Sequence, residues 1–192
     1  MDFPLHRSRR VALYSHDTMG LGHARRNLLI AQALATGASP PTILLIAGVR
    51  EVTAFPLPPG TDQLTLPALG KSADGRYHAR SLGLSLAEIV SLRQRTIAAA
   101  LEAFEPDVLI VDNVPRGAVR ELDPALAQLR RSGRTRCVLG LRDVLDELVG
   151  RLRCALPMCP AIEVALQGRT CAANDRPTGV AAITGLLPRG GA

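Results

Sequence analysis

A short polar stretch near the start of the chain holds the residues best suited to chemistry. It contains two glycines, Gly20 and Gly22, directly before an apolar segment of helical character. A glycine loop that enters a helix exposes free backbone N–H groups at the positive end of the helix dipole, where anions and above all phosphates bind. Arg25 and Arg26 add positive charge to the first helical turn. We expect a bound anion at this loop, and the alternative is that both arginines simply face solvent.

Two histidines in the same stretch, His16 and His23, are candidates for proton transfer. Histidine exchanges protons near neutral pH because its unperturbed pKa is about 6.5. His23 follows Gly22 directly, and its alternative role is a polar cap of the helix. Asp17 stands next to His16 and is a possible partner for it, although the side chains of adjacent residues usually point apart.

The elements that must position these residues are indicated by five apolar runs separated by helical or loop segments. The runs, which predict strands, span residues 11–14, 42–46, 62–66, 108–111 and 136–139. Helices are expected over residues 23–35, 86–104, 117–122 and 123–131, and residues 67–83 are expected to form a long polar loop. A capping box, Ser85 with Glu88, marks the start of the second helix. The alternation predicts an α/β fold with a doubly wound parallel sheet.

The order 3-2-1-4-5, common in such sheets, places the first and fourth strands side by side at the switch point. His23 and Asp112 would then face each other across the crevice where ligands bind in these folds. Asp112 could accept the N–H of the His23 ring and fix its tautomer. The substrate-binding candidates around this crevice are His16, Thr18, Gly20, Gly22, Arg25, Arg26 and Asn113.

Composition excludes several classes of protein. The chain has 192 residues, of which 47% are hydrophobic, 21% charged and 3% aromatic, with a net charge of +6. The scarcity of aromatic residues removes the stacking platforms of single-strand binders, so no nucleic-acid partner is expected. The sequence has no apolar run near twenty residues and no signal peptide, which predicts a cytoplasmic protein and leaves peripheral contact with a membrane open.

Nucleotide-cofactor and metal motifs are incomplete. The dinucleotide fingerprint fails at its third glycine, where Arg25 stands, and Gly70-Lys71-Ser72 lacks the earlier glycine of a P-loop at Thr65. An NAD(P)-dependent oxidoreductase is therefore the less favoured alternative, and no cofactor is expected. The cysteines lack neighbouring histidines, so no metal is expected either. The four cysteines are Cys137, Cys154, Cys159 and Cys171.

The periodic pattern fades near residue 150. We predict a Rossmann-like domain over residues 1–150 and a poorly patterned, less ordered tail over residues 151–192. Within the tail, Val164–Leu166 and Val180–Leu187 are weak strand candidates.

Four segments in order resemble GT-B glycosyltransferases, and in particular predicted bacterial glycosyltransferases similar to MurG, the peptidoglycan N-acetylglucosaminyl transferase. They are SHDTMGLGHARRNLLIAQAL (15–34), KSADGRYHARSLGLSLAEIVSLR (71–93), FEPDVLIVDNVPRG (104–117) and CVLGLRDVLDE (137–147). The resemblance implies that the chain is the acceptor-side, N-terminal half of a GT-B fold. In this family the histidine after the glycines acts as a base and an aspartate after the fourth strand orients it, roles that would fall on His23 and Asp112.

A complete GT-B enzyme has a second Rossmann-like domain that binds the nucleotide-sugar. The resemblance therefore implies hexosyl transfer from a nucleotide-sugar to an acceptor hydroxyl, with the donor bound only when a second domain or partner chain is present. This chain by itself is expected to be inactive. A small Rossmann-like ligand-binding module or a pseudoenzyme is the alternative.

Overall fold

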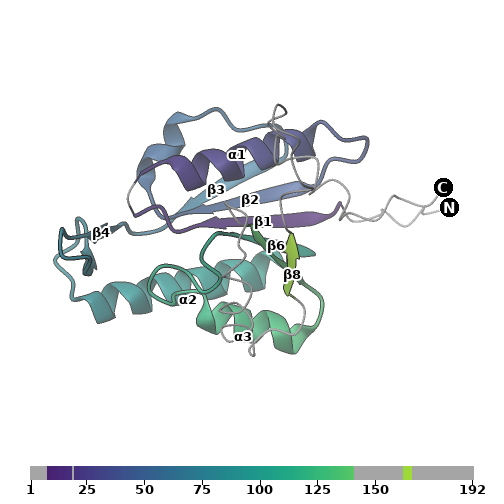
Figure 1. The fold of residues 1–192 in the computed structure, drawn as a ribbon. Coiled ribbons are helices and arrows are strands. Elements are labelled where there is room, and N and C mark those ends of the chain that lie inside the picture. Colours follow the sequence, from purple (N-terminus) through teal and green to yellow (C-terminus); the bar gives the residue numbers. More distant parts are fainter. Residues whose placement is uncertain (1–7, 19, 141–161, 166–192) are drawn as a thin grey trace, which may run out of the picture.

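The computed structural model describes residues 8–18, 20–140 and 162–165 (Figure 1). In this part of the chain six parallel strands form one sheet in the order β3-β2-β1-β6-β7-β8. The strands are β1 (Arg10–Ser15), β2 (Thr42–Ala47), β3 (Thr61–Thr65), β6 (Val108–Asp112), β7 (Arg136–Gly140) and β8 (Ile162–Ala165). The first five correspond to the five predicted runs in the predicted order, so the doubly wound α/β fold is confirmed.

Helices cover both faces of this sheet (Figure 1). Helix α1 (Gly22–Ala35) lies on one face, and α2 (Leu86–Phe104) and α3 (Asp123–Ser132) lie on the other. Successive residues of a strand point to opposite faces. In β1, Leu13 accordingly packs with the core under α1, and Tyr14 packs with the core under α2 and α3. Burial on both faces explains why the strands read as continuous apolar runs.

The predicted start of α2 and the predicted end of α3 are confirmed, and both carry capping signals in the sequence. The Ser85 side chain accepts a hydrogen bond from the Glu88 N–H, and the Glu88 carboxylate accepts one from the Ser85 N–H. Gly133 ends α3 in the left-handed conformation, with φ 65°. These signals act within one helical turn, so the local sequence is sufficient to set them.

The prediction of a helix over residues 117–122 is wrong. The segment instead forms consecutive turns in which Gly117 and Arg120 have φ values of 79° and 63°. The buried Glu121 carboxylate accepts the Val119 N–H, so it bonds locally to a backbone group of the turn. A left-handed residue at two positions of the segment is incompatible with a continuous α-helix.

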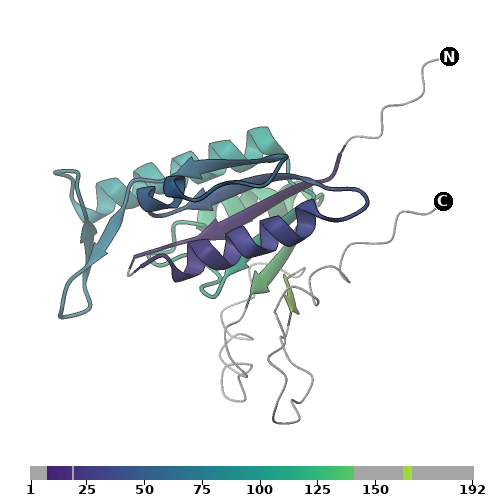
Figure 2. The same cartoon turned by 90° about the horizontal axis from the view of Figure 1, so that it is seen from above.

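The predicted loop over residues 67–83 contains an antiparallel hairpin, β4 (Leu69–Lys71) paired with β5 (Tyr77–Ala79). Three-residue strands are too short to show a period, so the sequence did not reveal them. The hairpin projects beyond the sheet on the side of the carboxyl ends of the strands (Figure 2). A short 3-10 helix, η1 (Arg50–Ala54), follows β2 and was also not predicted.

Strand β8 lies within the stretch predicted as a poorly patterned tail and overlaps the candidate strand Val164–Leu166. Its four residues pair with β7. The predictions for the rest of residues 151–192, including Val180–Leu187, fall outside the described residues. None of the described helices is both long enough and apolar enough to cross a membrane.

Candidate functional site

The candidate site lies at the carboxyl edge of the sheet, where β1 and β6 are neighbours. Their register pairs Tyr14 with Val111, so the loop after β1 and the end of β6 emerge side by side. That loop leads into α1, which begins at Gly22. Topology therefore brings Asp112 next to the first turn of α1, as the sequence predicted.

One buried carboxylate joins two residues of that turn. The Asp112 side chain is 1% exposed; its Oδ2 lies 2.6 Å from His23 Nδ1, and its Oδ1 accepts a 2.5 Å hydrogen bond from Arg26 Nη1. His23 and Arg26 are three residues apart, so they lie on the same face of α1. His23 remains 18% exposed and Arg26 32%. The structure thus brings His23 and Asp112 together, and it adds Arg26 to the pair.

This arrangement selects one tautomer of the His23 ring. An ionised carboxylate only accepts hydrogen bonds, so the proton of the neutral ring belongs on Nδ1. The lone pair of Nε2 then remains as an acceptor. A neutral imidazole held in this way by a carboxylate is the base arrangement found in nucleophile–base–orienter sites.

His16 lies beside His23, with 4.6 Å between the ring centroids. It is buried, and its Nδ1 has no hydrogen-bond partner among the described residues. Burial lowers the pKa of His16, and the neighbouring His23 lowers it further, while nearby carboxylates oppose this only in part. His16 therefore presents a neutral ring at cellular pH.

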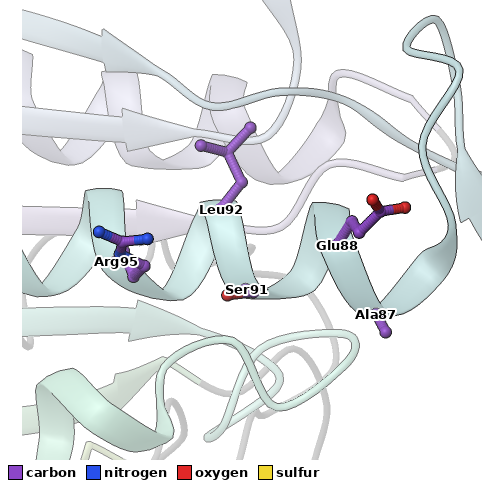
Figure 3. Close-up of a pocket in the computed structure, with 5 residues that line it drawn as sticks. All are labelled: Ala87, Glu88, Ser91, Leu92 and Arg95. Carbon is purple, nitrogen blue, oxygen red and sulfur yellow. The ribbon is translucent and has the colours of Figure 1, made fainter.

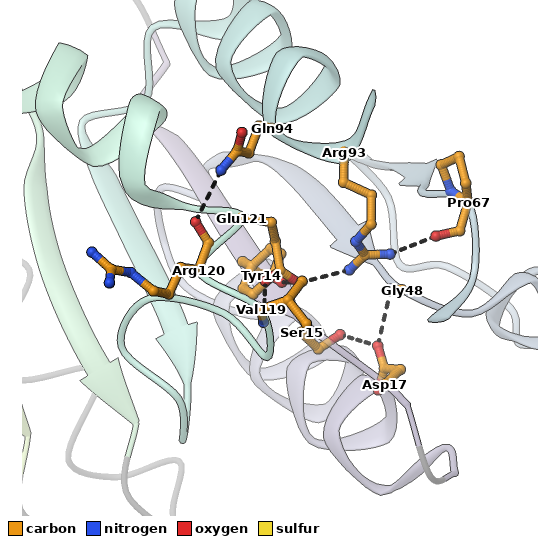
Figure 4. A network of polar contacts seen from close by, with 10 residues as sticks. All are labelled: Tyr14, Ser15, Asp17, Gly48, Pro67, Arg93, Gln94, Val119, Arg120 and Glu121. Carbon is orange, nitrogen blue, oxygen red and sulfur yellow. Dashed lines mark hydrogen bonds and ion pairs between the residues drawn. The ribbon is translucent and has the colours of Figure 1, made fainter. Parts of the chain in front are cut away.

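Asp17, in the loop before α1, caps the start of this helix, a role that the sequence analysis missed. Its buried carboxylate accepts the Ala24 N–H at 2.9 Å. It also accepts the Ser15 hydroxyl and the Gly48 N–H (Figure 4). The residue itself has a left-handed backbone, with φ 44°. Asp17 is thus a cap of α1 placed seven residues before its donor. The usual signal, an acceptor directly before the helix, was absent.

Gly48 allows the loop after β2 to pack against the loop that carries His16. A Cβ at this position would lie 1.9 Å from the His16 carbonyl oxygen, so only glycine fits. The close approach fixes the path of the backbone between β1 and α1. Two contacts therefore fix this loop: the close approach of Gly48 to the His16 backbone and the hydrogen bonds that Asp17 accepts.

The remaining candidates surround this cluster without a hydrogen bond to it. Gly20, Gly22 and Arg25 are exposed, and an added Cβ at either glycine would have nothing within 4 Å. Thr18 and Asn113 are half-buried. Asn113 has φ 63°, and its N–H donates to the Gly140 carbonyl at 2.7 Å, which turns the chain after β6. The substrate contacts of these residues stay predictions.

A second polar network lies beneath the site, on the α2 face of the sheet (Figure 4). Arg93 is fully buried and donates to Glu121 at 3.0 Å and to the Pro67 carbonyl at 2.6 Å. The Tyr14 hydroxyl donates to the same Glu121 carboxylate at 2.7 Å. The sequence did carry a signal, because Arg93 stands in the apolar stripe of α2 between Ile89 and Ile97.

Burial and charge shift the pKa values in this network. Burial raises the pKa of Tyr14, and the Glu121 carboxylate raises it further. Burial also raises the pKa of Glu121, but Arg93 and the hydrogen bonds from Tyr14 and Val119 together outweigh it and hold that pKa below its ordinary value. The ion pair therefore joins α2, β1 and the turns before α3 at neutral pH.

Two hollows on the described surface lie away from His23. One, of about 430 Å³, is on the outer face of α2 and is lined by Ala87, Glu88, Ser91, Leu92 and Arg95 (Figure 3). The other, of about 410 Å³, includes Glu105 and Arg134 near the ends of α2 and α3. Within residues 8–18, 20–140 and 162–165, no three histidine, cysteine or acidic side chains are grouped so as to hold a metal ion.

The strand order, the helical layers and the polar carboxyl edge define the class of protein as a Rossmann-like α/β domain. No protein-family model and no curated protein matches the chain.

Among solved structures the chain is similar to enzymes named as UDP-N-acetylglucosamine 2-epimerases. One, from Listeria monocytogenes and assigned this activity, has a TM-score of 0.44 at 17% identity over 69% of this chain and 31% of that chain. Another has a TM-score of 0.43 at 12% identity over 69% and 33%. A third, from Neisseria meningitidis with bound UDP-GlcNAc, has a TM-score of 0.41 at 14% identity over 73% and 33%. The chain spans about a third of the length of these proteins.

Proposed function

We propose that this chain is the acceptor-binding half of a glycosyltransferase that moves a hexosyl group from a nucleotide-sugar to a hydroxyl. The observation that carries the proposal is the 2.6 Å contact between His23 Nδ1 and Asp112 Oδ2 at the carboxyl edge of the sheet. Because His23 is partly exposed and Asp112 is buried, a substrate reaches the histidine and not the carboxylate. His23 is the proposed general base, and Asp112 orients it.

In the proposed reaction, His23 Nε2 takes the proton of the acceptor hydroxyl as its oxygen bonds to the anomeric carbon of the sugar. The bond from that carbon to the phosphate oxygen of the donor breaks, and its electron pair leaves with the nucleotide. The ring becomes an imidazolium, which the Asp112 carboxylate stabilises across the short contact. The base later returns its proton to solvent.

The surroundings of His23 favour a neutral group over a phosphate at this position. The Ala24 N–H at the helix start donates to Asp17, and Arg26 donates to Asp112. Two of the anion-binding features that the sequence indicated thus contact carboxylates of the chain itself. Arg25 is exposed and remains the proposed contact for a charged part of the acceptor.

The donor site is proposed to lie on a second Rossmann-like domain, in the same polypeptide or in a partner chain. The described residues form one such sheet, and its carboxyl edge supplies the acceptor side. We also propose a cytoplasmic location, with peripheral membrane contact, no nucleic-acid partner and no cofactor of its own.

Epimerisation of a nucleotide-sugar is the second candidate, because a partly exposed histidine held by a buried carboxylate can also remove a carbon-bound proton. Inverting a carbon centre requires a second group that returns a proton from the opposite face. His16 lies directly against His23, with 4.6 Å between the ring centroids, so this second group would have to come from the facing domain. The solved structures named above as UDP-N-acetylglucosamine 2-epimerases make this the natural competitor to test.

The experiment uses the chain together with the domain or partner that binds the nucleotide-sugar, in D2O, with and without an acceptor alcohol. A transferase forms a new glycoside only when the acceptor is present and leaves the carbon-bound hydrogens of the donor unexchanged. An epimerase incorporates deuterium at a ring carbon without any acceptor. Mass spectrometry and proton NMR separate the two, and deuterium exchange that is lost in His23→Ala would replace the first proposal by the second.

A further inference from the structure

We propose that Arg26 is a positioning residue that acts through Asp112 to keep the proton of the His23 ring on Nδ1 and its lone pair on Nε2. The inference rests on the proposed role of His23 as the base. It departs from the sequence-based expectation, in which Arg26 binds an anion of the substrate.

The geometry gives each oxygen of one carboxylate its own partner. Asp112 Oδ1 accepts from Arg26 at 2.5 Å, and Oδ2 lies 2.6 Å from His23 Nδ1. With the side chain only 1% exposed, water has little access to replace either contact. Arg26 therefore prevents the carboxylate from rotating, and the oxygen that faces His23 stays in place.

The charge of Arg26 matters as much as its position. A buried carboxylate requires a cation nearby, because burial without a partner is costly. Arg26 supplies that cation at Oδ1, and so it leaves Oδ2 to the His23 ring. The groups that face the ring are His16 from the loop after β1, Asp112 from β6 and Arg26 from α1 itself.

Arg25 offers a matched control on the same helical turn. It carries the same charge at the same end of α1, but it is exposed and makes no described contact with Asp112. Removing either arginine changes the net charge and the helix-end field equally. Only the removal of Arg26 takes away the contact that positions the carboxylate.

The test is 15N NMR of the histidine rings in the full chain without substrate, in Arg25→Met and Arg26→Met variants beside the parent. At pH 8 we expect the parent and Arg25→Met to show His23 with its proton on Nδ1. In Arg26→Met, the His23 ring should show a mixture of tautomers, with its proton on Nδ1 in some molecules and on Nε2 in others. An unchanged His23 signal in Arg26→Met, with the fold intact by its amide spectrum, would overturn the proposal.

Arg26→Lys keeps the inference testable if Arg26→Met does not fold. Lysine keeps the charge but lacks the planar guanidinium. The positive charge beside Asp112 is therefore kept, while the tautomer of the His23 ring becomes mixed. A parent-like tautomer in Arg26→Lys would show that the positioning contact is dispensable and would count against the proposal.

The measurement also separates this inference from the proposed function. If the tautomer responds to Arg26 but His23→Ala leaves turnover of the completed enzyme unchanged, positioning stands and the base assignment fails. If His23→Ala removes turnover but Arg26→Met changes neither the tautomer nor kcat, His23 is the base and Arg26 does not position it. A positioning role predicts about a tenfold fall in kcat with little change in KM.

Discussion

At the residue scale, the contacts of His23 separate the two roles that the sequence left open. A helix cap would accept a backbone N–H of the first turn, but the described cap acceptor of α1 is the Asp17 carboxylate. The His23 ring instead contacts Asp112. His23 therefore does not cap α1, and its side chain is available to contact a substrate.

We expect His23→Ala to lower turnover of the completed enzyme by about 100-fold or more, the usual effect of losing a general base. Asp112→Asn should cost less, because it disturbs orientation but leaves the ring. Turnover and melting temperature are measured on the same proteins. Unchanged turnover in His23→Ala would end the catalytic assignment.

Asp17→Ala should lower the free energy of unfolding by about 1–2 kcal/mol, because the Ala24 N–H loses its acceptor at the start of α1. Thr18→Ala is the control, since Thr18 is half-buried on the same loop and makes no hydrogen bond among those described. Urea unfolding followed by circular dichroism gives both values. Equal losses in the two variants would contradict the capping role.

At the scale of elements, the Arg93–Glu121 pair fixes how α2 and the turns before α3 meet β1. Both side chains are fully buried; Tyr14 also donates to Glu121, and Arg93 also donates to the Pro67 carbonyl. A buried pair of this kind is a weak source of net stability but is costly to break. It therefore ties the orientation of these elements to one arrangement.

Arg93→Met should destabilise the fold by about 3–5 kcal/mol, because it leaves the Glu121 carboxylate buried without its cation. Adding Glu121→Gln to Arg93→Met should recover part of the loss. Chemical unfolding at pH 7 tests both variants. A double variant less stable than Arg93→Met would contradict the pairing.

Low pH should lower the free energy of unfolding of the parent chain, because it protonates Glu121 in the Arg93–Glu121 pair. The pKa of Glu121 is lower in the folded chain than its ordinary value, so its contribution to stability is present above the unfolded pKa of about 4.3. That contribution is lost as the pH falls through the folded pKa. Unfolding free energies at pH 7 and below pH 4 should therefore differ less in Glu121→Gln than in the parent.

At the scale of the whole molecule, exposed leucines collect at one end of the structure. Leu82, Leu84, Leu86 and Leu92 are 36–45% exposed, within the loop before α2 and its first turns. Arg80 and Arg95, both exposed, flank them. Apolar side chains with nearby cations suit the surface of an anionic bilayer.

Replacing Leu82 and Leu84 by serine should therefore reduce co-sedimentation with phosphatidylserine-containing vesicles by at least threefold. Leu29→Ser is the control, because Leu29 is an exposed leucine, at 58%, on α1 across the sheet. Vesicles of phosphatidylcholine alone should bind weakly, since they lack the negative surface. Equal vesicle binding of all variants would contradict a role of these leucines in membrane contact.

The chain by itself should bind nucleotide-sugars weakly, because the proposed donor site belongs to a second domain. Isothermal titration calorimetry of the purified chain with a nucleotide-sugar should detect no binding in the micromolar range. Micromolar affinity would make the chain a self-sufficient ligand-binding module.

The order of the strands, the start of α2 and the end of α3 were readable from the sequence, because local rules set them. Strands buried on both faces need continuous apolar runs, and capping signals act within one turn. The meeting of His23 with Asp112 also followed, since the switch point of a doubly wound sheet brings these positions together whatever the details of the loops.

The partners of the polar side chains emerged only in three dimensions. Asp17 reaches a donor seven residues away, Arg93 meets Glu121 across 28 residues, and Arg26 meets Asp112 across 86. Which donor faces which acceptor depends on the path of the loops and on the close contact at Gly48. Arg25 and Arg26 are adjacent and of the same type, so the sequence does not distinguish their roles. The fold does, because only Arg26 lies on the face of α1 that contacts the buried Asp112 carboxylate.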